Sequence, residues 1–65
     1  MKVNSSTIDE IDYVAGLMYV KYKNWATYQY EWVQPDHHRK IINADSKWSE
    51  LKKILKTYSY KYKKL

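Results

Sequence analysis

Lysine and tyrosine residues recur together near the C-terminal end of the chain, a combination suited to binding nucleic acid. Lysine side chains neutralise phosphates, and tyrosine rings stack on bases irrespective of the sequence of the strand. The final residues, Tyr58 to Leu65, follow a lysine-rich stretch and alternate between aromatic and polar side chains. We therefore expect a basic surface for RNA or single-stranded DNA formed by Lys52, Lys53, Lys56, Lys61, Lys63, Lys64, Tyr58 and Tyr60.

The same alternation allows a simpler explanation. In an extended segment, successive side chains point to opposite faces, so the tyrosines share one face and Lys61 and Lys63 the other. Phosphates and bases would then be contacted from different faces, unless the segment lies in a groove. Alternatively, the tyrosine face packs against the protein and the lysine face is in water.

A second aromatic group lies at the centre of the chain, in the stretch Tyr28-Gln29-Tyr30-Glu31-Trp32-Val33. In a strand, the alternating Tyr28, Tyr30 and Trp32 share one face. On an open face they would be a stacking platform for bases, and beneath helices they would be core. Core tyrosines need hydrogen-bond partners for their hydroxyls. The sequence leaves both functions open for Tyr28 and Tyr30.

Residues for catalysis or metal binding are not grouped in a recognisable way. His37 and His38 are adjacent, and adjacent residues on a helix diverge by about 100°, so both cannot readily bind one ion. No serine has a recognisable base beside it, and no glycine-rich phosphate loop is present. We therefore expect no metal, no cofactor and no enzymatic activity.

An acidic strip, Asp9, Glu10 and Asp12, supports a second functional hypothesis. Acids beside aromatic residues are suited to contacting a basic protein, or to mimicking phosphates. The alternative function is therefore that of a small protein that binds and inhibits another protein. Acids on a short strand also simply keep a sheet edge from pairing. A third possibility is an accessory structural domain, as a monomer or a weak homodimer paired through a strand edge.

Composition limits the class of protein. With 65 residues, the chain has room for one domain, residues 1–65, with one core. Its net charge of +5 is uneven: residues 1–33 carry 3 Lys and 4 acids (−1), and residues 34–65 carry 8 Lys, one Arg and 3 acids (+6). Such polarity predicts one basic end and an acidic partner. The absence of cysteine, of a membrane-spanning apolar run and of a signal peptide predicts a cytoplasmic protein without membrane contact.

Hydrophobic periodicity predicts an α+β fold. Strands are expected over 8–13, 17–23 and 27–33, with turns at Gly16 and Asn24, giving a three-stranded antiparallel meander. Pro35 favours the start of a first helix, which ends over 43–45. Ser46 is a suitable N-cap for a second, amphipathic helix. Two helices pack on one sheet face, and the alternating C-terminal residues form an extended tail or an extra edge strand.

The order of these motifs resembles that of the KTSC domain family. The resemblance rests on hydroxyl-rich Ser5-Ser6, on Val20-Lys21-Tyr22, on the central Tyr28-Gln29-Tyr30 and on Ala44-Asp45-Ser46-Lys47. The family is named for its place at the C-terminus of some lysyl-tRNA synthetases, and it includes stand-alone bacterial and phage proteins. It implies no established activity, only a suggestion of RNA binding. Its small stand-alone copies suit a phage setting in a bacterial host cell, so the resemblance makes the alternative a phage-type small protein that inhibits a host protein or defence complex. The sequence differs from the family pattern where Asn24-Trp25 and Trp48 replace common glycines.

Overall fold

The N-terminal half of the chain forms two successive β-hairpins. In the computed structural model, which describes residues 1–65, strand β1 (Ile8–Val14) pairs antiparallel with β2 (Leu17–Tyr22). Strand β2 pairs in turn with β3 (Thr27–Tyr30). The first turn places Ala15 and Gly16 at φ values of 50° and 83°, in the left-handed region that glycine enters without steric cost. The predicted meander is confirmed.

Strand β3 ends at Tyr30, before the predicted end at Val33. Trp32 has a φ of 56°, and this left-handed conformation interrupts the alternation of a strand. Its side chain is 77% exposed. One ring atom lies 3.5 Å from the position that a Cβ on Gly16 would take. The prediction that Trp32 shares a face with Tyr28 and Tyr30 is therefore wrong.

Two helices follow, at the predicted positions. Helix α1 (Pro35–Ile42) begins with proline, whose missing N–H costs nothing in the first turn. Helix α2 (Lys47–Tyr58) has Ser46 as its N-cap, and the Ser46 hydroxyl accepts a hydrogen bond from the backbone N–H of Ser49 (3.4 Å). Ser59 ends α2 with a φ of 51° and donates its N–H to the Leu55 carbonyl.

The substitution Ser46→Ala is expected to lower the free energy of unfolding by about 1 kcal/mol, because it removes the side-chain acceptor for the first turn of α2. Urea denaturation followed by circular dichroism measures the change. Thr57→Ala, an exposed position in the same helix, is the matched control and should change stability by less than about 0.5 kcal/mol. Equal effects at both positions would contradict the capping role.

The C-terminal residues add a fourth strand to the sheet. Strand β4 (Tyr62–Lys64) pairs antiparallel with β3, so the strand order is β1-β2-β3-β4. This confirms the predicted extra edge strand, although it is shorter than the alternating stretch from Tyr58. At the opposite edge, Lys2 forms a β-bridge with Glu10, so residues near the N-terminus cover part of β1.

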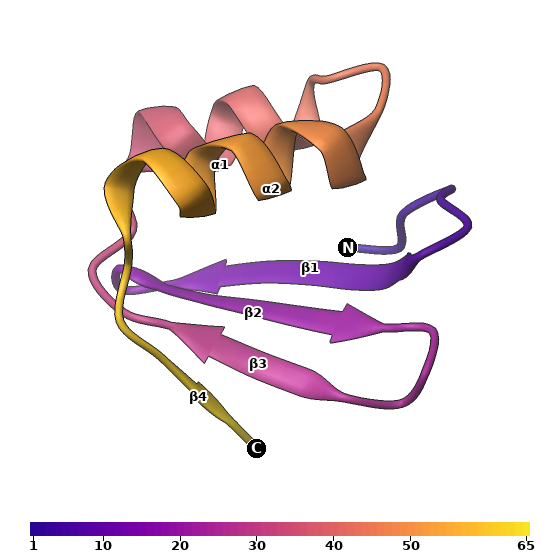
Figure 1. Ribbon diagram of the computed structural model, residues 1–65, viewed down its shortest axis with the longest axis horizontal. Coiled ribbons are helices and arrows are strands. Elements are labelled where there is room, and N and C mark those ends of the chain that lie inside the picture. Colours follow the sequence, from indigo (N-terminus) through magenta and orange to yellow (C-terminus); the bar gives the residue numbers. More distant parts are fainter.

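Both helices lie side by side on one face of the sheet (Figure 1). The core between the layers comes mainly from β1, β2 and the two helices. On the uncovered face, Tyr19 is paired with Asp12 and Gln29. No helix is long and apolar enough to cross a membrane. The buried apolar residues are Val3, Ile8, Ile11, Met18, Val20, Tyr30, Val33, Ile41, Leu51 and Ile54.

Candidate ligand-binding pocket

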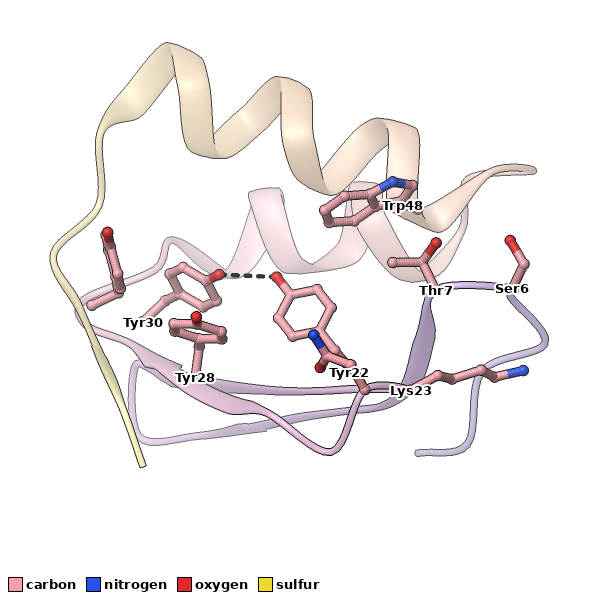
Figure 2. A pocket seen from close by; sticks show the side chains of 9 residues that line it. Ser6, Thr7, Tyr22, Lys23, Tyr28, Tyr30 and Trp48 are labelled. Carbon is pink, nitrogen blue, oxygen red and sulfur yellow. Dashed lines mark hydrogen bonds between the residues drawn. The ribbon is translucent and has the colours of Figure 1, made fainter.

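An open pocket of about 570 Å³ lies between the sheet and the start of α2 (Figure 2). Its volume is in the range of small-molecule sites. Residues from the segment before β1, from β2 and its turn, from β3, α2 and β4 all line it. Five of the nine are aromatic. The lining residues are Ser6, Thr7, Tyr22, Lys23, Asn24, Tyr28, Tyr30, Trp48 and Tyr62.

The aromatic rings of the pocket contact one another in a continuous chain. Tyr22 meets Tyr28 and Trp48 edge to face, with ring centroids 5.6 and 5.7 Å apart. Tyr62 of β4 lies 5.8 Å from both Tyr28 and Tyr30. Because each ring supports its neighbours, the walls of the pocket are preformed and still leave ring surface open to a ligand.

Tyr22 and Tyr30 share a hydrogen bond between their hydroxyls, 3.0 Å apart, at the base of the pocket (Figure 2). The tyrosine hydroxyls thus find a partner, as expected for core residues. Burial raises the pKa of Tyr22, and its hydrogen bond to Tyr30 adds to this effect. Burial also raises the pKa of Tyr30. Both hydroxyls stay neutral and uncharged at neutral pH.

Alkaline pH is expected to unfold the protein partly through these two residues. Their folded-state pKa values lie above the usual 10.0, so they add stability below about pH 10 that is lost as pH rises further. Tyr22→Phe should weaken this pH dependence. Urea unfolding at a series of pH values measures it. A pH dependence unaffected by Tyr22→Phe would contradict the assignment.

The lysines of α2 fall into two groups. Lys52 Nζ lies 5.2 Å from the ring centroid of Trp48, at the pocket. Lys56 is one turn further along the same helix face, because residues four apart are neighbours. Lys53 instead borders a second, polar cavity between the helices, together with Lys40. The predicted lysine surface is thus divided, and of the three α2 lysines in it only Lys52 and Lys56 are in line with the aromatic pocket.

The lysines near the C-terminus lie around β4. Lys61 precedes the strand, and its carbonyl accepts a hydrogen bond from the Glu31 N–H (2.8 Å). Lys63 pairs with Gln29, which belongs to the uncovered face, and Lys64 pairs with Tyr28 of the pocket. All three are exposed. Phosphate contacts by this group would therefore be split between the two faces of the sheet.

Tyr58 and Tyr60 hold the segment between α2 and β4 against α1. Both contact the ring of His37, at 4.1 and 5.8 Å between centroids, and the Tyr60 hydroxyl is hydrogen-bonded to His37 Nδ1. His37 is buried. These two tyrosines lie away from the pocket that Tyr28 and Tyr30 line, so the structure divides the predicted aromatic set as well.

His38 and the acidic strip have partners inside the protein. His38 stacks on Tyr13 with centroids 4.6 Å apart, and burial lowers its pKa. Asp12 pairs with the N-terminal ammonium (2.7 Å), Glu10 with Lys2 (3.4 Å), and Asp9 with Lys2 and Lys21 (3.8 and 3.9 Å). Three acids whose charges are compensated in this way make a weak mimic of phosphates.

Several pocket residues were not among the predicted site residues, notably Tyr22, Lys23, Asn24 and Trp48. For Tyr22, the predicted hairpin of the second and third strands could have identified its place beside Tyr28. Val20 pairs with Tyr28, and Tyr22 shares the strand face of Val20 two residues further on, so Tyr22 and Tyr28 are diagonal neighbours. No sequence pattern could have placed Trp48 in the pocket, because its position depends on how α2 crosses the sheet.

Comparison with known proteins gives the family. The family model of the KTSC domain matches residues 4–62. This chain belongs to the KTSC domain family. The Tyr-x-Tyr motif, Tyr28-Gln29-Tyr30, contributes both of its tyrosines to the pocket. Asn24 and Trp48 also line the pocket, and Trp25 lines a smaller cavity beside it.

A KTSC domain protein from Yersinia pestis has a similar crystal structure, with a TM-score of 0.90 and 25% sequence identity. The superposition covers 100% of this chain and 93% of that protein. No curated protein matches the sequence. The chain therefore shares the fold of that KTSC domain protein along its length.

Proposed function

We propose that this KTSC domain is a non-enzymatic module that binds single-stranded nucleic acid, RNA or DNA. The observation that carries the proposal is the aromatic pocket, which Lys23 and Trp48 help to line. Lys52 lies over the Trp48 ring, and Lys56 follows one helical turn further along α2. Stacking on aromatic rings combined with neutralisation of phosphates is how single strands are bound without sequence preference.

Charge supports an anionic partner. The nine lining residues include one cation and no carboxylate. Neither Lys23 nor Lys52 or Lys56 forms an ion pair within the protein, so these ammonium groups are available to phosphates. The binding unit in this proposal is a single chain, because one chain supplies the whole pocket. The proposal places this chain in the cytoplasm.

A titration with fluorescently labelled single-stranded RNA, single-stranded DNA and duplex, each at 50 and 200 mM salt, tests the proposal. We expect saturable binding of the single strands that weakens at the higher salt, and weaker binding of the duplex, whose bases are not free to stack. No binding of any single strand by micromolar protein at low salt would refute the proposal.

Inhibition of a host protein is the second candidate, and it rests on a different region. Trp32 and Val14 are 77% and 62% exposed, beside the β1–β2 turn. Exposed tryptophan is enriched at the centres of protein interfaces. If this function holds, Trp32→Ala should abolish capture of a bacterial host protein by the immobilised chain, while the Lys52 and Lys56 charges should be dispensable.

A further inference from the structure

The pocket has an aromatic end and a polar end. Figure 2 shows Tyr28 and Tyr30 at one end, and Ser6, Thr7 and Lys23 at the other. The hydroxyls of Ser6 and Thr7 make no hydrogen bond within the protein. The polar end therefore offers free hydroxyl groups next to an unpaired ammonium group. The other end offers the ring of Tyr28 and that of Tyr62, which is 63% exposed, while the buried Tyr30 supports them. A ligand that fits has a flat ring joined to an anionic group.

The charge of the lining decides between two ligand classes that aromatic cages accept. Cages of this kind bind quaternary ammonium groups through cation–π contacts. Here the one charged lining residue is Lys23, and Lys52 already occupies the vicinity of the Trp48 ring at 5.2 Å. Two ammonium groups would repel a cationic ligand and attract a phosphate. The pocket is thus suited to a nucleotide.

A second aromatic surface lies directly beside the pocket. Trp25, in the turn between β2 and β3, is 82% exposed and has a φ of 71°. A left-handed conformation costs a non-glycine residue about 1–2 kcal/mol, and here it presents the indole to solvent. Lys21 Nζ lies 5.5 Å from its ring centroid. A smaller cavity beside Trp25 shares Tyr22 and Lys23 with the pocket, and Asp9 lines it as well.

We propose that the pocket takes one unstacked base of a single strand, with its phosphate on Lys23, and that Trp25 stacks on the neighbouring base. This inference rests on the proposed function and adds the site and the number of bases. Lys23 lies between the two aromatic surfaces, where the phosphate that joins two successive nucleotides belongs. Lys52 and Lys56 continue the contacts along the strand.

The three tryptophans are internal reporters for this proposal. Their indole N–H signals are followed by ¹H–¹⁵N NMR during titration with a ten-nucleotide oligouridylate and with the matching oligothymidylate. The signals of Trp48 and Trp25 should shift, and that of Trp32, at the other end of the sheet, should stay in place. If the oligonucleotide binds but only signals outside the pocket move, the inference is wrong and the proposed function stands.

Variants give an independent measurement of the same site. Trp25→Ala should weaken binding of the labelled oligouridylate about 5- to 150-fold, the loss of stacking on one base. Trp32→Ala is the matched control, because it removes an equally exposed tryptophan with a positive φ and should leave the affinity unchanged. Lys23→Gln should lower the slope of log affinity against log salt by about one, as expected for one phosphate contact.

The outcomes separate the two proposals. Equal affinity of the wild type, Trp25→Ala and Lys23→Gln, with normal binding of the oligonucleotide, would overturn the pocket alone. Absence of oligonucleotide binding to the wild type would overturn both. Both substituted side chains are exposed, so the variants are expected to fold, and circular dichroism confirms this before the titrations.

Discussion

Replacing Tyr30 with alanine is expected to lower the free energy of unfolding by about 3–5 kcal/mol, the range measured for aromatic residues truncated in protein cores. Tyr30 is 6% exposed and lies opposite Met18 on β2 and Tyr62 on β4. The substitution removes the ring and leaves a cavity that the paired strands cannot close. Urea denaturation followed by tryptophan fluorescence measures the loss. A near-neutral effect would contradict the placement of Tyr30 in the core.

Tyr30→Phe distinguishes the contribution of the ring to stability from that of the hydroxyl. This variant keeps the packing and removes only the hydrogen bond to Tyr22, so we expect a loss of about 1 kcal/mol. A small domain has only about 5–15 kcal/mol of stability, and Tyr30→Ala can therefore unfold much of the population. Tyr30→Phe remains folded and gives a measurable value in that case.

Neutralising Lys52 and Lys56 together should lower the slope of log affinity against log salt concentration by about two, because two phosphate contacts are lost. Between 50 and 200 mM salt, the wild type should then lose about tenfold more affinity than Lys52→Gln/Lys56→Gln. We expect these two lysines to contact phosphates because they follow Trp48 at four-residue spacing on one face of α2, beside the pocket. The labelled oligonucleotide titration at both salt concentrations provides the measurement.

The matched control is Lys40→Gln/Lys53→Gln. It removes the same number of charges from the cavity between the helices, where Asp36 and Glu50 are also present. If binding depends only on net charge, both double variants will behave alike. If it depends on the row beside the pocket, only Lys52→Gln/Lys56→Gln will change the slope. Identical slopes for the two variants would refute the localised surface.

Local patterns were sufficient to predict most of the fold. The alternation along β2, the turn at Gly16, Pro35 at the start of α1 and Ser46 before α2 each specify structure within a few residues. Each signal depends on backbone conformations that neighbouring residues determine. Elements defined in this way can be predicted from the sequence without knowledge of the tertiary contacts.

At Trp32, the local sequence pattern predicts the wrong backbone conformation. Its sequence pattern continues the strand, but the chain must leave the sheet to reach Pro35, and the backbone turns at Trp32 with a positive φ. Val33 is then buried, and its carbonyl accepts a hydrogen bond from the Tyr13 hydroxyl. These tertiary contacts stabilise a conformation that no local propensity favours.

The candidate site was predicted only in part, for a related reason. Tyr28, Tyr30 and Lys52 were identified from their types and spacing. Their association with Ser6, Thr7 and Trp48 depends on the packing of α2 over the β2–β3 hairpin, which the pattern of a single segment does not specify. Tyr58 and Tyr60 are also tyrosines close to lysines in the sequence. In the structure, however, they contact the buried His37 and not the pocket.

The lining of the pocket extends from Ser6 to Tyr62, nearly the whole length of the chain. A fragment of the chain, or a partly unfolded one, therefore has no complete pocket, and a ligand held there binds only the native state. Thermodynamic linkage then converts occupancy into stability. A ligand present at 100 times its dissociation constant should add about 2.7 kcal/mol to the free energy of unfolding. A rise in melting temperature would thus report on ligands whose identity is still unknown, before any labelled probe is made.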